Sequence, residues 1–419
     1  MKVSTTKSKI AGEVTAPSSK SYTIRGLMCA ALAKGRSELI HPLNSDDTEA
    51  AAKVLGQLGV NIHKKGDYWQ VVGGHLKPPT EDLFCRDSAA TLRFMTAICA
   101  FVSGKCRLVP GPSLSKRPIT PLLQALGQLE VNCHTDGTSV IVYGDGLKGG
   151  TAELPGEISS QFVSALLLIA PLAEEAMSIR LTSPPQSKPY LKMTLECLEK
   201  FGVKVRTSQD LRKFKVAKQE YRPTSYQIEG DWSSASYLLA LGAVLGEVTV
   251  ANLNPESLQG DKIVLNLLKD MGAQVLVSGN TVTVQKSELR AITTDLSDCI
   301  DLLPTLAVLA AVADGVNRFT GIGRARLKES NRVAALREGL TRMGIKVIEG
   351  TDSLTIVGSR PEGSVIDSHD DHRIAMAFGI LGLRAGETTI DGAECVTKTY
   401  PEFWDILKGL GGKVKLDVK

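Results

Sequence analysis

Two short segments carry residue types suited to proton transfer. Lys328-Glu329-Ser330-Asn331-Arg332 places a carboxylate between cations, and Cys299-Ile300-Asp301 places an isolated acid at the start of an apolar run. One carboxylate that removes a proton and another that donates one form the usual general acid–base pair. The alternative for Glu329 is a salt-bridged surface acid.

Metal chemistry is not expected. His369 and His372 flank two aspartates, but no other ligand cluster accompanies them. The eight cysteines are scattered and form no C-x-x-C pair. They therefore indicate buried thiols of a reducing compartment rather than a zinc site or a disulfide framework.

Polar residues recur at two places along the chain, where helices are expected to begin. One set precedes apolar segments such as 89–101, 162–172, 234–245 and 302–313. It consists of Pro17-Ser18-Ser19-Lys20-Ser21, Arg86-Asp87-Ser88, Glu157-Ile158-Ser159-Ser160-Gln161, Asp231-Trp232-Ser233-Ser234, Cys299-Ile300-Asp301 and Asp370-Asp371-His372-Arg373. The other set consists of Asp46-Asp47, Arg117-Pro118, Ser187-Lys188-Pro189, Gly260-Asp261, Asn331-Arg332 and Lys398-Thr399-Tyr400-Pro401. Many of these residues are helix-capping types, so capping alone is one interpretation.

The cations among them favour a second interpretation. A helix N-terminus presents unpaired N–H groups and the positive end of the macrodipole, so it favours acids over bases. Cations nevertheless stand at or near several starts: Lys20, Arg25, Arg117, Lys188, Arg332, Arg373 and Lys398. We expect them to need a compensating anion, which predicts a site for a small polyanion bearing phosphate and carboxylate groups.

A repeated phrase spaces these clusters. A helix end, a glycine and the start of a β-branched strand recur six times at intervals of 67 to 72 residues. The marker positions are Gly59, Glu130, Gly202, Gly272, Gly344 and Gly411. Glycine suits the left-handed conformation that ends a helix, and a hairpin-like pattern of strand, turn and strand follows each marker. Six units of about 70 residues predict a repeat protein with two groups of three.

Bulk properties exclude several classes. The 419 residues exceed one ordinary core, and a net charge of +4 from well-mixed residues argues against a nucleic-acid surface. No stretch of 18 uncharged apolar residues occurs, and the N-terminus lacks the apolar core of a signal peptide. We expect a cytoplasmic protein without a membrane partner.

Eight motifs in order resemble the 5-enolpyruvylshikimate-3-phosphate synthase family over essentially the whole chain. They are Pro17–Arg25, Lys116–Ile119, Ser159–Gln161, Ser187–Tyr190, Gly230–Ser236, Arg326–Arg332, Asp371–Arg373 and Lys398–Pro401. The resemblance implies an α/β fold of six βαβαββ repeats, three per domain, arranged as an inside-out α/β barrel. It implies one domain of residues 1–18 and 228–419, another of 19–227, and an active site in the cleft between them.

The resemblance also implies a reaction. The enolpyruvyl group of phosphoenolpyruvate passes to the 5-hydroxyl of shikimate 3-phosphate and phosphate leaves, with no cofactor or metal, in a monomer. Shikimate 3-phosphate is expected to contact Lys20, Ser21, Arg25, Ser159, Ser160, Gln161, Ser187, Asp301 and Lys328. Phosphoenolpyruvate is expected to contact Lys20, Ala89, Arg117, Gln161, Arg332, Arg373 and Lys398. Catalysis is expected to use Lys20, with Asp301 as proton acceptor and Glu329 as donor.

Departures from the family pattern are informative. Ala89 stands where the family commonly has glycine, which implies the glyphosate-tolerant type, with glyphosate a weak inhibitor. Asp87 replaces an asparagine, Asn331 a frequent aspartate, and Ser113 and Ser115 replace cations. The last two changes are expected to weaken phosphoenolpyruvate binding.

Two rival functions remain at the level of sequence. A UDP-N-acetylglucosamine enolpyruvyl transferase shares the fold and the donor, but that family usually has a reactive cysteine in the loop where this chain has 111–117 without one. A non-catalytic anion-binding protein would not need Asp301 and Glu329 together.

Overall fold

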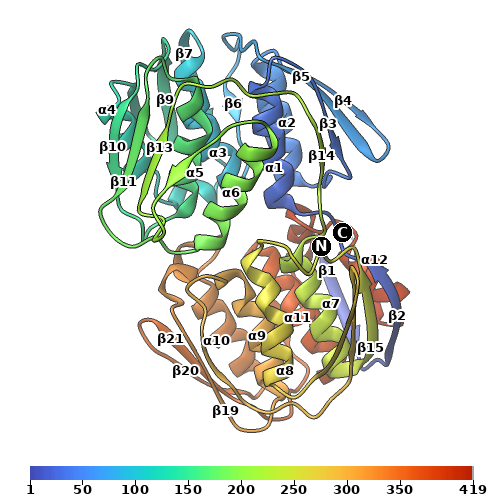
Figure 1. Cartoon of the computed structure of the whole chain (residues 1–419). Helices are drawn as coiled ribbons and strands as arrows, with labels where there is room; N and C mark the ends of the chain where they lie inside the picture. Colours follow the sequence, from blue (N-terminus) through green and yellow to red (C-terminus); the bar gives the residue numbers. More distant parts are fainter. Residues whose placement is uncertain (418–419) are drawn as a thin grey trace. The chain divides into compact units, whose positions relative to one another are not determined.

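Six four-stranded sheets and twelve α-helices make up the described part of the chain, residues 1–417 of a computed structural model (Figure 1). Contacts divide it into two compact units, unit 1 (1–17 and 230–417) and unit 2 (18–229). Each unit has its own hydrophobic core. The expected α/β architecture of six repeats is thus confirmed. None of the described helices is long and apolar enough to cross a membrane.

Unit 2 contains the first three repeats. Its helices are α1 (Lys20–Leu32), α2 (Asp46–Gln57), α3 (Ala89–Ile98), α4 (Thr120–Gln128), α5 (Ser160–Ile169) and α6 (Lys188–Lys200). Its sheets, in strand order, are β14 (Ser225–Gln227), β3 (Gly35–Ile40), β5 (Tyr68–Gly73), β4 (Asn61–Lys65); β6 (Leu83–Phe84), β7 (Gly104–Val109), β9 (Ser139–Gly144), β8 (Asn132–Asp136); and β10 (Gly150–Leu154), β11 (Met177–Leu181), β13 (Lys213–Val216), β12 (Arg206–Thr207).

Unit 1 contains the other three. Its helices are α7 (Trp232–Leu245), α8 (Val264–Asp270), α9 (Leu303–Val312), α10 (Arg332–Arg342), α11 (His372–Ala385) and α12 (Phe403–Gly409). Its sheets are β2 (Ile10–Thr15), β15 (Gly246–Ala251), β17 (Thr281–Gln285), β16 (Gln274–Ser278); β18 (Thr293–Asp295), β19 (Val316–Thr320), β21 (Ser353–Val357), β20 (Lys346–Glu349); and β22 (Val365–Asp367), β23 (Thr388–Asp391), β1 (Lys2–Thr6), β24 (Lys413–Asp417).

Short 3-10 helices connect several of these elements. They are η1 (Cys99–Phe101), η2 (Leu114–Lys116), η3 (Ala170–Leu172), η4 (Gly260–Ile263), η5 (Ile300–Leu302), η6 (Gly323–Leu327) and η7 (Ala393–Lys398).

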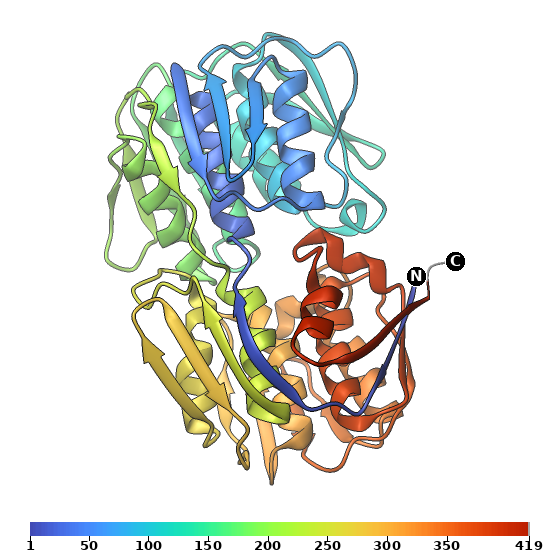
Figure 2. The ribbon, with the colours of Figure 1, turned by 90° about the vertical axis from the view of Figure 1, so that its right-hand side faces the viewer.

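Every sheet repeats one pattern, in which the first two strands are parallel and the remaining pairs are antiparallel. In the sixth sheet β1 takes the third position and pairs with both β23 and β24. The first and last described strands of the chain therefore lie side by side, as Figure 2 shows.

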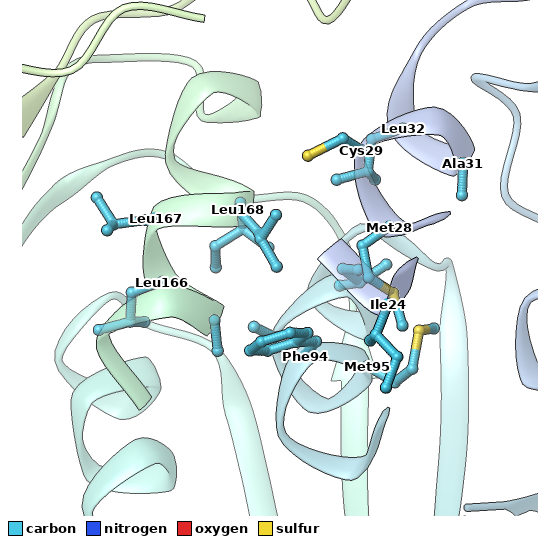
Figure 3. Packing of buried hydrophobic residues seen from close by; sticks show 14 of the residues in the cluster. Ile24, Met28, Cys29, Ala31, Leu32, Phe94, Met95, Leu166, Leu167 and Leu168 are labelled. Atoms are coloured by element: carbon cyan, nitrogen blue, oxygen red, sulfur yellow. The ribbon is translucent and has the colours of Figure 1, made fainter. Parts of the chain in front are cut away.

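One helix of each repeat is buried almost all round. In unit 2 these are α1, α3 and α5, which contribute Ile24, Phe94 and Leu166 among others to a shared core (Figure 3). In unit 1 they are α7, α9 and α11. Because these helices are apolar on most faces, most of their polar residues stand at the N-termini; Arg25 inside α1 and Arg93 inside α3 are buried exceptions.

The predicted left-handed helix ends are confirmed at all six markers. The φ angles are 89° at Gly59, 64° at Glu130, 83° at Gly202, 88° at Gly272, 80° at Gly344 and 98° at Gly411. Each marker residue follows the end of a helix and precedes a strand. Because the markers are regularly spaced, the helix starts are regularly spaced as well.

Candidate active site

The predicted site residues collect at helix starts in both units. Unit 2 holds Lys20, Ser21 and Arg25 on α1, Ala89 at the start of α3, Arg117 before α4, Ser159, Ser160 and Gln161 at the start of α5, and Ser187 before α6. Unit 1 holds Asp301 in η5, Lys328 and Glu329 between η6 and α10, Arg332 and Arg373 at the starts of α10 and α11, and Lys398 in η7.

Lys398 is not at the α-helix start expected from the sequence. It is the last residue of η7, and α12 begins only at Phe403. Its side chain is nevertheless buried. The prolyl residue that suggested a helix start, Pro401, lies in the turn between η7 and α12.

Arg332 forms the centre of an ionic cluster in unit 1. Its Nη1 donates to Asp301 Oδ1 at 2.7 Å and its Nη2 to Glu329 Oε2 at 2.7 Å. Asp371 accepts from Nε at 2.8 Å and from Nη2 at 3.2 Å, and also accepts from Ser330 Oγ at 3.0 Å. The guanidinium is 1% exposed. One buried cation therefore fixes both candidate acid–base carboxylates.

This cluster corrects part of the charge argument from the sequence. Arg332 was expected to need an external anion, but the protein supplies Asp301, Glu329 and Asp371. Glu329 is not a surface acid either, because its side chain is 11% exposed and bonded to a buried guanidinium. Sequence reasoning gave no pairing role to Asp371, since 39 residues separate it from Arg332.

Asp301 is surrounded by cations. Besides Arg332, Lys328 Nζ lies 3.3 Å and Arg373 Nε 3.7 Å from its Oδ1. Burial alone would raise the pKa of Asp301, but the three cations outweigh it and hold that pKa well below its usual range. Asp301 is thus ionised throughout the neutral range and available to accept a proton when charge shifts during a reaction.

Asp261 is a further buried acid. The sequence indicates it only as part of a helix start. It lies in η4, is 4% exposed and accepts a hydrogen bond from Ser233 Oγ through Oδ2, whereas Oδ1 has no hydrogen-bond partner among residues 1–417. Burial, and next the charge of Asp301, raise the pKa of Asp261 to about 6.

Arg25 in unit 2 is a buried cation without an acidic partner in the described chain. Its Nε donates to Thr194 Oγ1 at 2.8 Å, its Nη1 to Ser21 O at 3.1 Å and its Nη2 to Tyr190 O at 3.4 Å. It is 2% exposed, and burial lowers its pKa. An unbalanced buried charge costs several kcal/mol, so an anionic ligand would stabilise this group.

Lys20 is balanced within unit 2. Its Nζ lies 2.8 Å from Oδ2 of Asp47, a carboxylate that is itself buried. The Asp46-Asp47 segment predicted as a helix start thus also holds a candidate catalytic lysine in place, a role that the sequence did not reveal.

Two departures from the family pattern have structural roles. Asp87 Oδ1 accepts from Leu114 N at 2.8 Å, so Asp87 anchors the loop that leads to Arg117. Asn331 caps α10, because its Oδ1 accepts from Ala334 N at 3.1 Å. Ala89, which stands where the family commonly has glycine, is the first residue of α3 and is 6% exposed.

Arg93 is a polar residue of this region that sequence reasoning left out of the site. It is buried on α3 and donates to Ser159, Gln161 and the carbonyl of Pro118. The signal was available, since Arg93 is the one charged residue in the apolar segment 89–101.

Residues 1–417 contain no group of three or more His, Cys, Asp or Glu side chains arranged to hold a metal ion. The chemistry that these residues offer is proton transfer by carboxylates and binding of anions by cations and hydroxyls.

Known proteins of one family are similar to this chain over its whole length. The family model for EPSP synthase (3-phosphoshikimate 1-carboxyvinyltransferase) matches residues 4–407. A 3-phosphoshikimate 1-carboxyvinyltransferase of Dehalococcoides mccartyi is 50% identical over the full length of both chains. One from Methanosarcina mazei is 42% identical over 99% of each.

Solved structures agree. An EPSP synthase from Acinetobacter baumannii superimposes with a TM-score of 0.83 at 27% identity, covering 99% of this chain and 100% of that one. The enolpyruvyl transferase NikO from Streptomyces tendae reaches 0.79 at 18% identity, covering 99% and 98%, and shows the fold alone. The match of fold, family model and full-length relatives means that this chain belongs to the EPSP synthase family.

Proposed function

We propose that this protein transfers the enolpyruvyl group of phosphoenolpyruvate to the 5-hydroxyl of shikimate 3-phosphate and releases phosphate, a step toward chorismate and the aromatic amino acids. Membership of the family supports this activity. The observation that carries it is the single guanidinium of Arg332 that holds Asp301 and Glu329 together, since the reaction needs a proton acceptor and a proton donor. The non-catalytic rival does not account for that pair, and the relatives at 50% and 42% identity are named 3-phosphoshikimate 1-carboxyvinyltransferases, which favours shikimate 3-phosphate over a sugar nucleotide as acceptor.

In this proposal cationic and hydroxyl side chains bind most of the negatively charged groups of the two substrates. Shikimate 3-phosphate contacts Lys20, Ser21, Arg25, Ser159, Ser160, Gln161, Ser187, Asp301 and Lys328. Phosphoenolpyruvate contacts Lys20, Ala89, Arg117, Gln161, Arg332, Arg373 and Lys398. The unbalanced charge of buried Arg25 supports the first assignment. We assign two roles to Arg332. It binds phosphoenolpyruvate, and because three carboxylates already surround it, it also aligns the acid–base pair.

The chemical steps follow from these assignments. The 5-hydroxyl oxygen bonds to C2 of phosphoenolpyruvate while its proton passes to Asp301, and Glu329 delivers a proton to C3. The tetrahedral adduct then returns a proton from the new methyl group to the deprotonated Glu329 and expels phosphate, which restores the double bond. Lys328, Arg332 and Arg373 stabilise the charge that moves during these steps.

The test is phosphate release from phosphoenolpyruvate with shikimate 3-phosphate, with UDP-N-acetylglucosamine, and with neither. We expect release only with shikimate 3-phosphate. Release with the sugar nucleotide alone supports the first rival, and binding of shikimate 3-phosphate without turnover supports the non-catalytic rival.

We propose that the protein is of the glyphosate-tolerant type. The methyl group of Ala89, at the buried start of α3, crowds the inhibitor more than the shorter substrate. Ala89→Gly should lower the glyphosate concentration for half-inhibition at least tenfold, roughly the cost of one poorly placed methyl group. Potent inhibition of the unaltered enzyme, unchanged in Ala89→Gly, contradicts this.

We further propose a monomer in the cytoplasm. All eight cysteines are free thiols, as expected in a reducing compartment. Sedimentation of the full chain tests the monomer, and a dimer at micromolar concentration contradicts it.

A further inference from the structure

Arg93 is the one charged residue of the otherwise apolar helix α3. It lies on α3, is 4% exposed, and its guanidinium carbon stands 4.8 Å from the ring centroid of Phe162 on α5. A buried guanidinium stacked on an aromatic ring is held in one orientation. Its donors therefore point at fixed targets.

Those targets come from two different segments. Nη1 donates to Gln161 Oε1 at 2.8 Å and to Ser159 Oγ at 3.1 Å, while Nη2 donates to Pro118 O at 3.0 Å. Ser159 and Gln161 begin α5, and Pro118 follows Arg117 directly. Arg93 thus connects the start of α5 with the segment that carries a candidate phosphoenolpyruvate cation.

The bonds also determine what Gln161 can offer a ligand. A glutamine amide has an acceptor end and a donor end, and arginine has donors only. Because Oε1 accepts from Arg93, the two N–H groups of Nε2 lie on the other side of the amide. Nothing among residues 1–417 accepts a hydrogen bond from Nε2, and the side chain is only partly buried.

The same reasoning applies to Ser159. Its Oγ accepts from Arg93 Nη1 at 3.1 Å and from Gln161 N at 3.3 Å, which fills both lone pairs. The hydroxyl proton then has to be donated outward. Two groups that are intrinsically able to donate or accept are both left as donors.

We propose that Arg93 is a positioning residue that fixes Gln161 and Ser159 as hydrogen-bond donors for the oxyanion groups of the substrates. The inference rests on the proposed function, which assigns both residues to substrate binding. Arg93 itself does not contact substrate in this account. Its effect passes through the amide and the hydroxyl that it orients.

The test is a double-mutant cycle on phosphate release. Arg93→Met keeps the length and apolar stem of the side chain but removes every donor, so the amide of Gln161 is free to reverse. We expect the KM for the substrates to rise about tenfold with kcat changed less than threefold, the size of one lost ligand hydrogen bond. Arg93→Lys, which retains a donor, should recover part of the loss.

In a background carrying Ser159→Ala and Gln161→Ala, Arg93→Met should change KM less than twofold, because its targets are gone. Arg107→Met is the matched control, since Arg107 of the same unit makes an exposed pair with Asp82 at 2.7 Å. It should leave KM unchanged in both backgrounds.

Each outcome has a consequence. An equal rise in KM in both backgrounds, or a lowered melting temperature with KM unchanged below it, overturns the positioning role while the proposed function stands. If the unaltered enzyme does not release phosphate in response to shikimate 3-phosphate, the proposed function fails and this inference fails with it.

Discussion

At the residue scale, the site is built from charges that the protein balances internally and charges that it leaves unbalanced. Arg332 is neutralised by Asp301, Glu329 and Asp371, while Arg25 has no acidic partner in the described chain. The first arrangement fixes carboxylates for proton transfer, and the second leaves attraction for an anion. The two kinds of cation therefore have different tasks.

Removing either candidate acid–base carboxylate should lower kcat strongly. Asp301→Ala and Glu329→Gln are each expected to reduce kcat by roughly 10²-fold or more, the usual contribution of general acid–base catalysis. Steady-state phosphate release measures this, and circular dichroism checks that the variants fold. Asp391→Asn, which alters an exposed ion pair with Lys2, is the control and should keep full kcat. Intact turnover in either test variant contradicts the assigned role.

The buried acid Asp261 should make stability depend on pH. Its pKa is raised to about 6 in the folded protein, first by burial and then by Asp301, from about 3.8 in the unfolded chain. The folded state therefore binds the extra proton, and the unfolding free energy falls as pH rises from about 4 to about 6.

Asp261→Asn removes that cost. Its unfolding free energy relative to the unaltered protein should increase by about 2 to 3 kcal/mol between pH 4 and pH 7, at 1.4 kcal/mol per unit of pKa shift. Urea unfolding at several pH values measures the difference. A difference that does not change with pH contradicts the prediction.

The sequence predicts which residues belong to the site better than it predicts which residues they contact. Asp301, Glu329 and the cations were recognised because their types and positions at helix starts carry information. Their pairing was not foreseen, because Asp301 lies 31 residues before Arg332, Asp371 lies 39 residues after it in the next repeat, and only the packing of η5, α10 and α11 brings them together. Arg93 and Asp47 were missed as positioning groups for the same reason.

At the element scale, the glycine phrase defines the repeat and shows one exception. Glu130 adopts a φ of 64° where the other five markers are glycines. A non-glycine residue in the left-handed region costs about 1 to 2 kcal/mol, partly offset by the greater chain entropy that glycine loses on folding. The Lys148 contact of Glu130, at 3.5 Å between exposed groups, compensates little.

Glu130→Gly should accordingly raise the unfolding free energy of unit 2 by about 0.5 to 1 kcal/mol. Urea unfolding measures it. Gly344→Ala is the matched control in the opposite direction, since φ is 80° there and no atom lies within 4 Å of an added Cβ, so backbone strain alone should destabilise it. A destabilised Glu130→Gly variant contradicts the argument.

Periodicity predicted the helices and hairpins well because each repeat encodes them locally. Segment 89–101, for example, forms α3 followed by η1, and the strand–turn–strand after Gly59 forms β4 and β5. Which strand completes which sheet depends on distant pairing. The placement of β14 beside β3, where Ser225 pairs with Glu38 far earlier in the chain, leaves no signal in the local pattern.

At the scale of the whole molecule, the chain passes between the units twice, after Pro17 and after Glu229. Unit 2 is one continuous stretch, and unit 1 is assembled from both ends of the chain. β1 contributes to unit 1 as an interior strand, with Val3 fully buried between β23 and β24.

An acid in that strand should destabilise unit 1 selectively. Val3→Asp buries an unpaired carboxylate and should lower the unfolding free energy by about 3 kcal/mol or more. Hydrogen exchange followed by mass spectrometry should show faster exchange across residues 230–417 and unchanged exchange in 18–229. Thr6→Asp, at an exposed position of the same strand, is the control. Equal loss of protection in both units contradicts the prediction.

The pairing of β1 with β24 has a consequence for biosynthesis. A ribosome makes β1 long before its partners in the sixth sheet, because β24 follows some 400 residues later. At about 5 to 20 residues per second, this strand waits tens of seconds, while unit 2 emerges as an uninterrupted segment and can fold in the meantime. The nascent chain therefore carries an unpaired strand while the rest of unit 1 is made. In that strand only Val3 is apolar, and the alternation of buried Val3 and Thr5 with polar Lys2, Ser4 and Thr6 limits the apolar surface exposed before pairing.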